Sequence, residues 1–553
     1  MTAVRDLADR FQDRWLAANP FAATSYGIPG YDDRVPDNSE AGDDQRRAEL
    51  ESMLEEGRSL EAGGLSGEDA ITISCLIEQG EQELSGLDAA PLEYTITPMP
   101  FSGPAAMLAI AARTIIADPK AASDYLERLR RSGGWIDQLT ERLRAGASKG
   151  RLPVAPIVEL AIKWTGTILS PDVPEPLAAP QPPTGWEGAT EWVATRDEVA
   201  REVVKPALAR WAAAARDVLE RSRPGERPGL GFLPGGAAAY SRAIRSHTTL
   251  PLTAEQLHQT GLDEIERLES RLVELGGEAG LQGLGAVQEA LRASAKDVDT
   301  SEAIREARAA IRRAEAAAPG FFPDPLPGPC EVTPMPSVVG RSGMAPHYTP
   351  PRQDGTRPGT FWFNTDIATA GTGWDLESVA FHEAVPGHHL QLSRIQLLSE
   401  LPALQRQRGL TVFSEGWALY AEQLAEEMGL YSDARSVLGM ITASLMRAAR
   451  LVLDTGLHAF GWGRGRALEF YEAHVPLPTA FLASEIDRYI VMPGQALAYM
   501  TGKLEILKLR EETSSRLGGA FSLPGFHSAV LDSGSLPMQV LRNKLEGWVP
   551  RPG

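Results

Sequence analysis

The sequence predicts a mainly α-helical protein, folded either as one large helical domain or as two lobes. Its 553 residues, 43% hydrophobic and 23% charged, are enough to bury a large core. Over most of the chain, apolar residues recur at helical spacing between breaks of Pro and Gly. Only residues 319–365 change toward Pro, Gly, aromatic and β-forming residues, so we expect a short β-hairpin or small sheet near 330–365.

The first third of the chain is predicted to be a series of helices. In residues 1–19, Val4, Leu7 and Phe11 are at helical spacing among charged residues, which indicates an amphipathic helix and not a signal peptide. Residues 41–60 and 67–84 are expected to form an antiparallel helix pair. Further helices are expected at 107–116, at 120–143 with a break at Gly133-Gly134, and at 156–168.

Residues 171–186 contain six prolines and are the best candidate for a boundary between two lobes, although a surface loop is an equal alternative. A long helix is predicted at 190–221 beyond them. Three more helices are expected at 253–275, 286–294 and 301–316.

The overall charge and the cysteine count exclude several classes of function. A net charge of −19 argues against nucleic acid as a partner, because binding to phosphates needs clustered Lys and Arg. Cys75 and Cys330 are the only cysteines, so a disulfide framework is not expected and a cytoplasmic location fits. We expect no membrane span, because no apolar run reaches about 18 residues.

Three of the nine histidines lie within eight residues, in the stretch Phe381-His-Glu-Ala-Val-Pro-Gly-His-His389. The stretch is similar to the H-E-x-x-H helix of zinc hydrolases, in which histidines at i and i+4 bind the metal and the glutamate is the general base. Here position i+4 from His382 is Pro386, and the next histidines are His388 and His389.

A straight helix cannot bring His382 together with either later histidine on one ion. Position i+6 lies roughly 120° away around the helix, and i+7 lies about 10.5 Å further along the axis, too far for bonds of about 2.0–2.1 Å. Pro386 removes one backbone N–H and Gly387 adds flexibility, so we predict a broken or bulged helix between Val385 and His388. Treating Pro-Gly as an insertion makes His388 the second ligand, with His389 as the alternative.

Two further segments are candidates for the same site. Glu331-Val-Thr-Pro and residues 359–365 are predicted strands around a loop with His347 and Tyr348, and an exposed strand here could pair with an extended peptide. A structural hairpin is the alternative. Glu415 lies in a strongly helical, apolar stretch 33 residues beyond His382, where a third metal ligand is usual in Glu-type zinc enzymes.

Four motifs identify a resemblance over most of the chain, from Pro20 to about Arg510. They are His382-Glu-x-x-Pro-Gly-His-His-x-Gln391, Glu415-Gly-Trp-Ala-Leu-Tyr-Ala-Glu422, Asp454-Thr-Gly-Leu-His458 and Arg488-Tyr-x-x-x-Pro-Gly-Gln-Ala496. Together they resemble the bacterial domain-of-unknown-function 885 family. That family is similar to helical Glu-type zincins such as angiotensin-converting enzyme and thimet oligopeptidase. The resemblance implies a single catalytic domain over 1–553, a two-lobed helical shell around a deep cleft, and a metal-binding core at 359–510.

The resemblance also implies the roles of individual residues. It gives His382, His388 and Glu415 as ligands of one Zn²⁺ ion, Glu383 as the general base, and Tyr489 with Arg488 as the oxyanion-stabilising pair. An ion pair with Glu485 or Asp487 is the structural alternative for Arg488. Candidate contacts for the substrate are Asn364, His389, His458, Gln495 and Tyr499.

These residues would support hydrolysis of an amide in a short peptide or a small molecule, by a water activated beside the metal. Two alternatives remain on the same fold: a metal-dependent lyase, and a binding protein without catalysis. A base next to two histidines favours an enzyme over a binding protein, because a binding module does not need one. We therefore predict a metallohydrolase, with no nucleic-acid or membrane partner.

Overall fold

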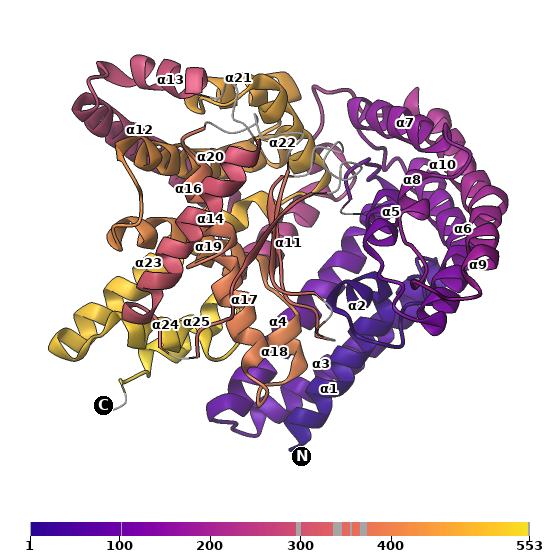
Figure 1. The fold of residues 1–553 in the computed structure, drawn as a ribbon, viewed down its shortest axis with the longest axis horizontal. Helices are drawn as coiled ribbons and strands as arrows, with labels where there is room; N and C mark the ends of the chain where they lie inside the picture. Colours follow the sequence, from indigo (N-terminus) through magenta and orange to yellow (C-terminus); the bar gives the residue numbers. More distant parts are fainter. Residues whose placement is uncertain are drawn as a thin grey trace.

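Helices make up most of the molecule, and a small sheet lies among them (Figure 1). The computed structural model describes residues 2–100, 102–294, 300–323, 325–335, 345–353, 355, 357–364 and 373–550. The predicted mainly α fold with a small sheet near 330–365 is confirmed. Residues 365–372 of the predicted metal-binding core lie outside the described residues. The buried apolar side chains form three clusters, which we call the bundle core, the sheet core and the α20 core.

The bundle core is built by the helices on the right of Figure 1. Apolar residues such as Leu129, Ile136 and Trp211 recur on one face of each helix, and these faces meet inside the bundle. The helices are α2 (Pro20–Tyr26), α5 (Gly103–Arg113), α6 (Pro119–Ser148), α7 (Ala155–Leu169), α8 (Glu175–Ala178), α9 (Ala189–Val199) and α10 (Lys205–Leu219).

One prediction in this bundle needs correction, and another is confirmed with an added turn. Helix α6 continues through Gly133-Gly134 without a break. A Cβ on Gly133 would lie 2.7 Å from Cγ1 of Val203, so this glycine lets two helices approach closely. The long helix predicted at 190–221 is observed as α9 and α10, which are continuous through a π-helical turn over Ala200–Val204, just before Pro206. A proline at this point removes a backbone N–H, which the turn accommodates.

The proline-rich segment 171–186 packs against the bundle. Leu177 is fully buried in the bundle core, and its carbonyl oxygen accepts a hydrogen bond of 3.1 Å from the hydroxyl of Tyr125. The lobe boundary expected there stays a prediction.

The sheet core contains the helices of the histidine motif. It joins amino-terminal helices to the carboxyl-terminal ones, and the pair α3 and α4 was correctly expected to pack together. Its helices are α1 (Ala3–Ala18), α3 (Glu40–Ala62), α4 (Gly67–Ala89), α14 (Thr300–Ala317), α16 (Leu376–Glu383), α17 (His388–Leu397), α18 (Ala403–Gln407), α19 (Thr411–Glu427), α24 (Leu523–Leu531) and α25 (Met538–Glu546).

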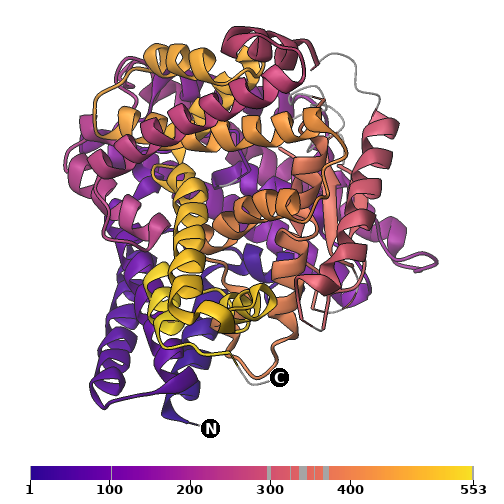
Figure 2. The same cartoon turned by 90° about the vertical axis from the view of Figure 1, so that its left-hand side faces the viewer.

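The α20 core surrounds the long helix α20 (Ala434–His458), seen at the top of Figure 2 with its neighbours. By length and composition α20 could cross a membrane, but 83% of its most apolar window is buried inside the protein, as in the core helix of a soluble fold. The other helices are α11 (Gly236–Thr248), α12 (Ala254–Glu278), α13 (Gly283–Ser294), α21 (Arg464–His474) and α22 (Thr479–Val491). Helices α19 and α23 (Ala498–Leu517) contribute to both this core and the sheet core.

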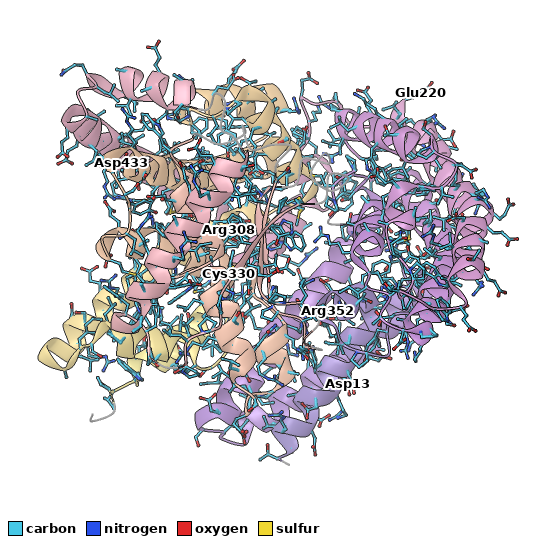
Figure 3. All side chains as sticks on the ribbon, in the orientation of Figure 1. Asp13, Glu220, Arg308, Cys330, Arg352 and Asp433 are labelled. Carbon is cyan, nitrogen blue, oxygen red and sulfur yellow. The ribbon has the colours of Figure 1, made fainter. Side chains whose placement is uncertain are left out.

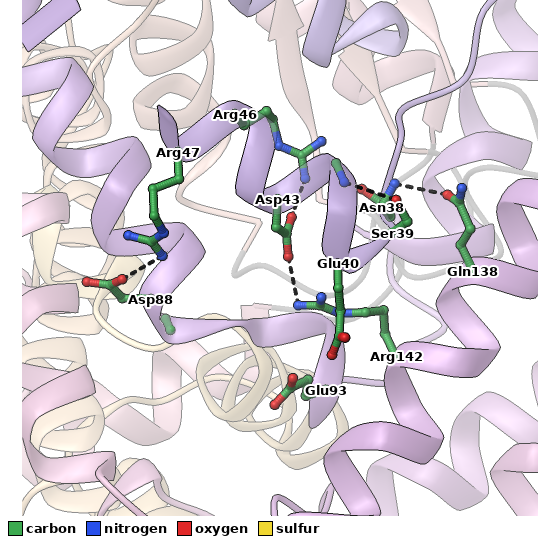
Figure 4. A network of polar contacts seen from close by, with 12 residues as sticks. Asn38, Ser39, Glu40, Asp43, Arg46, Arg47, Asp88, Glu93, Gln138 and Arg142 are labelled. Atoms are coloured by element: carbon green, nitrogen blue, oxygen red, sulfur yellow. Dashed lines mark hydrogen bonds and ion pairs between the residues drawn. The ribbon is translucent and has the colours of Figure 1, made fainter. Parts of the chain in front are cut away.

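Helix α3 is joined by polar contacts to α4 and to α6, as Figure 4 shows. Asp43 of α3 forms an ion pair of 2.8 Å with Arg142 of α6, whose side chain is 7% exposed. Arg47 of α3 pairs with Asp88 of α4 at 2.8 Å. The first contact ties the sheet core to the bundle, and it is shielded enough to contribute more than an exposed pair.

The sheet has the strand order β1-β3-β2, from β1 (Glu331–Pro334), β2 (His347–Thr349) and β3 (Thr360–Phe363). Strand β3 is parallel to β1 and antiparallel to β2, so the predicted loop around His347 and Tyr348 is itself a strand. Figure 3 shows Arg308 in the middle of the molecule, beside Cys330. Arg308 donates a hydrogen bond of 2.7 Å to the carbonyl oxygen of Val332 in β1. Because β3 is paired on both edges, it cannot accept an extended peptide, and pairing of a peptide with β1 or β2 stays a prediction.

Candidate metal centre

The helix that carries the histidines is interrupted, as predicted. Helix α16 ends at Glu383 and α17 begins at His388, with the turn 384–387 between them. A Cβ at position 387 would lie 1.9 Å from the carbonyl oxygen of His382, so only glycine fits there. The indole N–H of Trp417 on α19 donates a hydrogen bond of 3.0 Å to the carbonyl oxygen of Pro386 and anchors the turn.

The interruption brings His382, His388 and Glu415 together. The Nε2 atoms of both histidines lie 3.5 Å from the same oxygen, Oε2 of Glu415. One candidate ligand atom from each residue lies within 4.8 Å of the others. A tetrahedral ion with bonds of about 2.0–2.1 Å separates its ligand atoms by roughly 3.3 Å. The three residues therefore fit the ligand set of one divalent metal ion.

The remaining ring nitrogens of both histidines are held by other side chains. Nδ1 of His382 lies 2.7 Å from Oε1 of Glu422, and the other oxygen of that carboxylate accepts a hydrogen bond of 2.6 Å from Ser378. Nδ1 of His388 lies 3.3 Å from the hydroxyl of Ser414. A carboxylate on Nδ1 selects the tautomer that leaves Nε2 free for a metal.

The electrostatics of the site favour a positive charge between these residues. Burial alone would lower the pKa of His382, but hydrogen bonds to Glu415 and Glu422 and the charge of Glu383 raise this pKa to about 9. Burial would raise the pKa of Glu415, but its hydrogen bonds to the two histidines hold it well below its usual range. Without a metal, a proton on His382 balances the carboxylates, and a bound cation would take its place.

Glu383 lies beside the three ligands without belonging to the set. Its side chain is buried, and burial raises its pKa while the charges of His382 and His388 oppose the rise. The carboxylate also accepts a hydrogen bond from the backbone N–H of Tyr348 in β2. A buried carboxylate of raised pKa beside a metal site is suited to accept and return a proton.

His389, the alternative ligand, is turned away from the three residues. Its Nδ1 lies 2.9 Å from the hydroxyl of Tyr348, and its Nε2 lies 2.6 Å from the carbonyl oxygen of Gly328. Both ring nitrogens are therefore occupied. Its predicted contact with a substrate is not supported either, because neither nitrogen is free to make one.

Tyr489 and Arg488 lie in a closed network. The Tyr489 hydroxyl lies 2.8 Å from Oε2 of Glu485, 3.0 Å from Nε of Arg450 and 3.0 Å from the hydroxyl of Tyr471, and the side chain has no exposed surface. Arg488 forms a two-point ion pair with Glu485 at 3.0 Å for each bond. This contradicts the predicted oxyanion role of Tyr489, because three partners occupy its hydroxyl. For Arg488, the structural alternative is observed.

Tyr499 is a tyrosine that the charge of Glu415 reaches. It is half-buried on α23, and burial and the charge of Glu415 both raise its pKa. Gln495 donates a hydrogen bond of 3.4 Å to its hydroxyl. Helices α19 and α23 cross where Gly416 contacts Gly502. Gly416 follows Glu415 in the sequence, and Gly502 lies three residues after Tyr499. Two predicted substrate contacts, Gln495 and Tyr499, are thus neighbours of the site.

Of the two remaining candidates, His458 has structural surroundings, and the predicted role of Asn364 stays a prediction. His458 accepts a hydrogen bond of 3.0 Å from the N–H of Leu230 and lies 3.0 Å from the carbonyl oxygen of Tyr489, and burial lowers its pKa to about 4. It is a satisfied core residue, which corrects its predicted role. Asn364 follows β3 and has no exposed surface.

Sequence reasoning missed Glu422 and Arg450. Glu422 lies seven residues after Glu415 on α19, which places both carboxylates on one helix face. That spacing was a usable signal. Arg450 lies on α20 and reaches Tyr489 and Glu485 from a separate helix, and nothing local in the sequence indicates this contact.

Replacing Gly416 by Ala should damage the fold and the site together. A Cβ at this position would lie 2.5 Å from Cα of Gly502, so α19 and α23 must separate and move Glu415. We expect the free energy of unfolding to fall by about 1–3 kcal/mol, with weaker metal binding. Denaturant melts and metal titrations measure both effects. Gly134→Ala, at an exposed helical position with open space, is the control and should be neutral or stabilising. An unchanged melt for Gly416→Ala would contradict the close approach.

Comparisons with known proteins cover almost the whole chain. A family described as "Bacterial protein of unknown function (DUF885)" matches residues 20–545. A solved structure described as "the putative lipoprotein from Colwellia psychrerythraea" is 27% identical, with a TM-score of 0.89 over 99% of this chain and 98% of that chain. A second, "a putative lipoprotein of unknown function from Shewanella oneidensis", is 18% identical, with a TM-score of 0.74 over 98% of this chain and 99% of that chain. Curated proteins give no match. The likeness to Glu-type zincins stays a prediction.

Proposed function

The chain belongs to the DUF885 family of bacterial proteins of unknown function, and from its metal-ligand geometry we propose a zinc-dependent hydrolase of amide or peptide bonds. The substrate class is a short peptide or a small amide. The observation that carries the proposal is the pair of 3.5 Å separations between Oε2 of Glu415 and the Nε2 atoms of His382 and His388. Two imidazoles and one carboxylate are the ligands of hydrolytic zinc sites that keep one position open.

Glu422 supports this choice of metal and ligands. Its carboxylate is fully buried, holds Nδ1 of His382 and is itself held by Ser378. Such a carboxylate orients the histidine and raises its basicity as a ligand. A zinc ion bound there would polarise the substrate carbonyl and make water acidic enough to react near neutral pH.

Glu383 is the general base of the proposed reaction. Its carboxylate removes a proton from the attacking water while the water oxygen bonds to the carbonyl carbon. As the C–N bond breaks, Glu383 passes that proton to the leaving nitrogen. The N–H of Tyr348 holds the carboxylate in position throughout. The products are a carboxylic acid and an amine, so atoms and protons balance.

Tyr499 takes the oxyanion role first expected of Tyr489. Its phenol keeps its proton because burial and the Glu415 charge raise the pKa, so it can donate a hydrogen bond to the carbonyl oxygen as negative charge develops there. Gln495 and Arg488 position it, because Arg488 donates to Oε1 of Gln495 at 2.5 Å and Gln495 donates to the phenol.

The cytoplasmic location that the sequence predicts stays part of the proposal. Cys75 and Cys330 are both free, which suits the reducing cytoplasm that the sequence predicts. The neighbours described as lipoproteins would favour a place outside the cytoplasm instead.

The proposal is tested by metal analysis joined to a peptide and small-amide panel. The purified protein should carry one zinc per chain, chelation should abolish amide cleavage, and added zinc should restore it. In water labelled with ¹⁸O, the new carboxylate should gain the label. Cleavage that survives chelation would remove zinc from the reaction. An unsaturated product without the label would show elimination and exclude hydrolysis.

A further inference from the structure

Asp454 is a buried carboxylate that the proposed reaction does not use. It lies on α20 with no exposed surface. Its Oδ1 accepts a hydrogen bond of 2.6 Å from the hydroxyl of Tyr240 on α11. The backbone nitrogen of Gly494 lies 3.1 Å from each carboxylate oxygen, so its N–H is shared between them. This one side chain therefore joins α20 to α11 and to the turn at Gly494.

The turn at Gly494 is fixed by a close approach and by an attraction. Its φ of +83° lies in the left-handed region that favours glycine. A Cβ there would lie 3.0 Å from the backbone of Ala243, so α11 limits how close the turn can come. Asp454 supplies the attraction, because it binds the N–H of the same residue. The position of the turn therefore depends on Asp454.

The turn in its own right positions the proposed oxyanion donor. Gln495 follows Gly494 directly and donates a hydrogen bond of 3.4 Å to the hydroxyl of Tyr499. Arg488, which precedes the turn, donates to Oε1 of Gln495 at 2.5 Å. A shift of the turn moves Gln495 first and the phenol with it. A misplacement of about 1 Å can lower a rate by about 100-fold, so the turn matters for the reaction.

The charge of Asp454 depends on pH near neutrality. Burial raises its pKa to about 7, although the hydrogen bonds from Tyr240 and Gly494 and the charge of Arg488 oppose the rise. Burial also lowers the pKa of the histidines on this side of α20, so they are neutral there. The ionisable side chains on this stretch of α20 and on the helices packed against it include Arg450 and His458 on α20, Tyr240 on α11, His258 on α12 and Arg488 on α22.

Protonation of Asp454 removes its contact with the turn. A protonated carboxyl has one oxygen that donates, and that oxygen is no longer an acceptor for the shared N–H. The N–H of Gly494 cannot accept the added proton, whereas the hydroxyl of Tyr240 can turn to do so. The contact at Gly494 is therefore the one that is lost.

We propose that Asp454 is a positioning residue, whose ionised form holds the Gly494 turn and the Tyr499 phenol in the arrangement that hydrolysis needs. This inference rests on the proposed function and adds its regulation by pH. The same charge destabilises the fold. Because the pKa of Asp454 is raised above that of an unfolded chain, its contribution to stability is present at low pH and is lost as the pH rises through about 7.

Asp454→Asn should lower kcat roughly 10- to 100-fold at pH 8 and leave KM unchanged, because the oxyanion donor acts in the transition state. The asparagine carries an NH₂ group where the carboxylate accepts, so it resembles the protonated acid. At pH 6 the two proteins should be nearly equal. The measurement uses zinc-loaded protein and the peptide of the panel that the wild type cleaves fastest. In thermal melts the wild type should lose stability between pH 6 and pH 8 relative to the variant.

Two further variants separate positioning from a merely structural role. Tyr240→Phe removes a hydrogen bond that lowers the pKa of Asp454, so the midpoint of the pH profile of kcat should move to higher pH. Thr455→Val is the matched control. Thr455 is adjacent and equally buried, but its hydroxyl contacts His258 on α12 at 2.8 Å. Its melting temperature should fall while its kcat and pH profile stay those of the wild type.

Amide hydrogen exchange of the peptide segment that contains Gly494 gives a readout apart from turnover. At pH 8 this segment should exchange faster in Asp454→Asn than in the wild type, and at pH 6 the two rates should agree. Equal exchange at pH 8, or faster exchange with an unchanged kcat, would overturn the inference. Faster exchange without cleavage by either protein would keep the pH-dependent turn and overturn the hydrolysis. If Asp454→Asn does not fold, exchange in Tyr240→Phe at pH 7 decides: it should be faster than in the wild type, and equal rates would overturn the inference.

Discussion

His388→Ala should lose zinc, whereas His389→Ala should keep it. His388 places Nε2 3.5 Å from Oε2 of Glu415, and its loss leaves two of the three proposed ligands. The affinity should fall by more than about 100-fold, since even partners outside the ligand set are worth about 10- to 100-fold. His389 has both ring nitrogens bound elsewhere, so its loss affects stability and not the metal. Metal content after dialysis and calorimetric titration measure the difference.

The two histidines are adjacent in the sequence and similar in burial, at 8% and 2% exposed, so they are a matched pair. If His388→Ala binds zinc as tightly as the wild type, the ligand set is wrong. If His389→Ala loses the metal and His388→Ala keeps it, the register of the helix after the break is wrong.

Glu383→Gln should keep zinc and lose turnover. The substitution preserves size, and the amide oxygen can still accept the hydrogen bond from the N–H of Tyr348. It cannot take a proton from water, so kcat should fall roughly 10²- to 10⁴-fold. Steady-state kinetics on samples of measured zinc content separate the chemical effect from metal loss.

Glu377→Gln is the control on the same helix. Glu377 pairs with Arg313 and accepts a hydrogen bond of 2.8 Å from the N–H of Ser432, away from the ligand set. Its turnover should match the wild type. Full activity of Glu383→Gln at normal zinc content would remove Glu383 as the base.

The helices were predictable because their signals are local. Apolar spacing gave α1, α7, α12 and α14 to within a few residues. Glycine was an ambiguous signal for the end of a helix. Gly133 suggested a break, and yet it allows α6 to pack closely on Val203. Its meaning depends on what lies opposite, and the sequence near it does not contain that information.

The small sheet was predictable only in part. The β-forming runs at 331–334 and 360–363 were recognisable, because each carries β-branched or aromatic residues. The three residues of β2 have no pattern of their own. They form a strand because β3 offers them an edge, so their structure is decided by a partner.

By itself, the sequence determined the mainly helical fold and the break in the histidine helix. The break is local, because Pro386 has no N–H and only glycine fits at position 387 against the carbonyl of His382. The family resemblance of the motifs implied His382, His388 and Glu415 as one group, with His389 as the alternative to His388. The tertiary structure alone decided which tyrosine the charge of Glu415 reaches, that both nitrogens of His389 are occupied, and that Asp454 binds the N–H of Gly494. The physical reason is that periodicity tells which face of a helix is buried, whereas the partner of that face comes from residues far away in the chain.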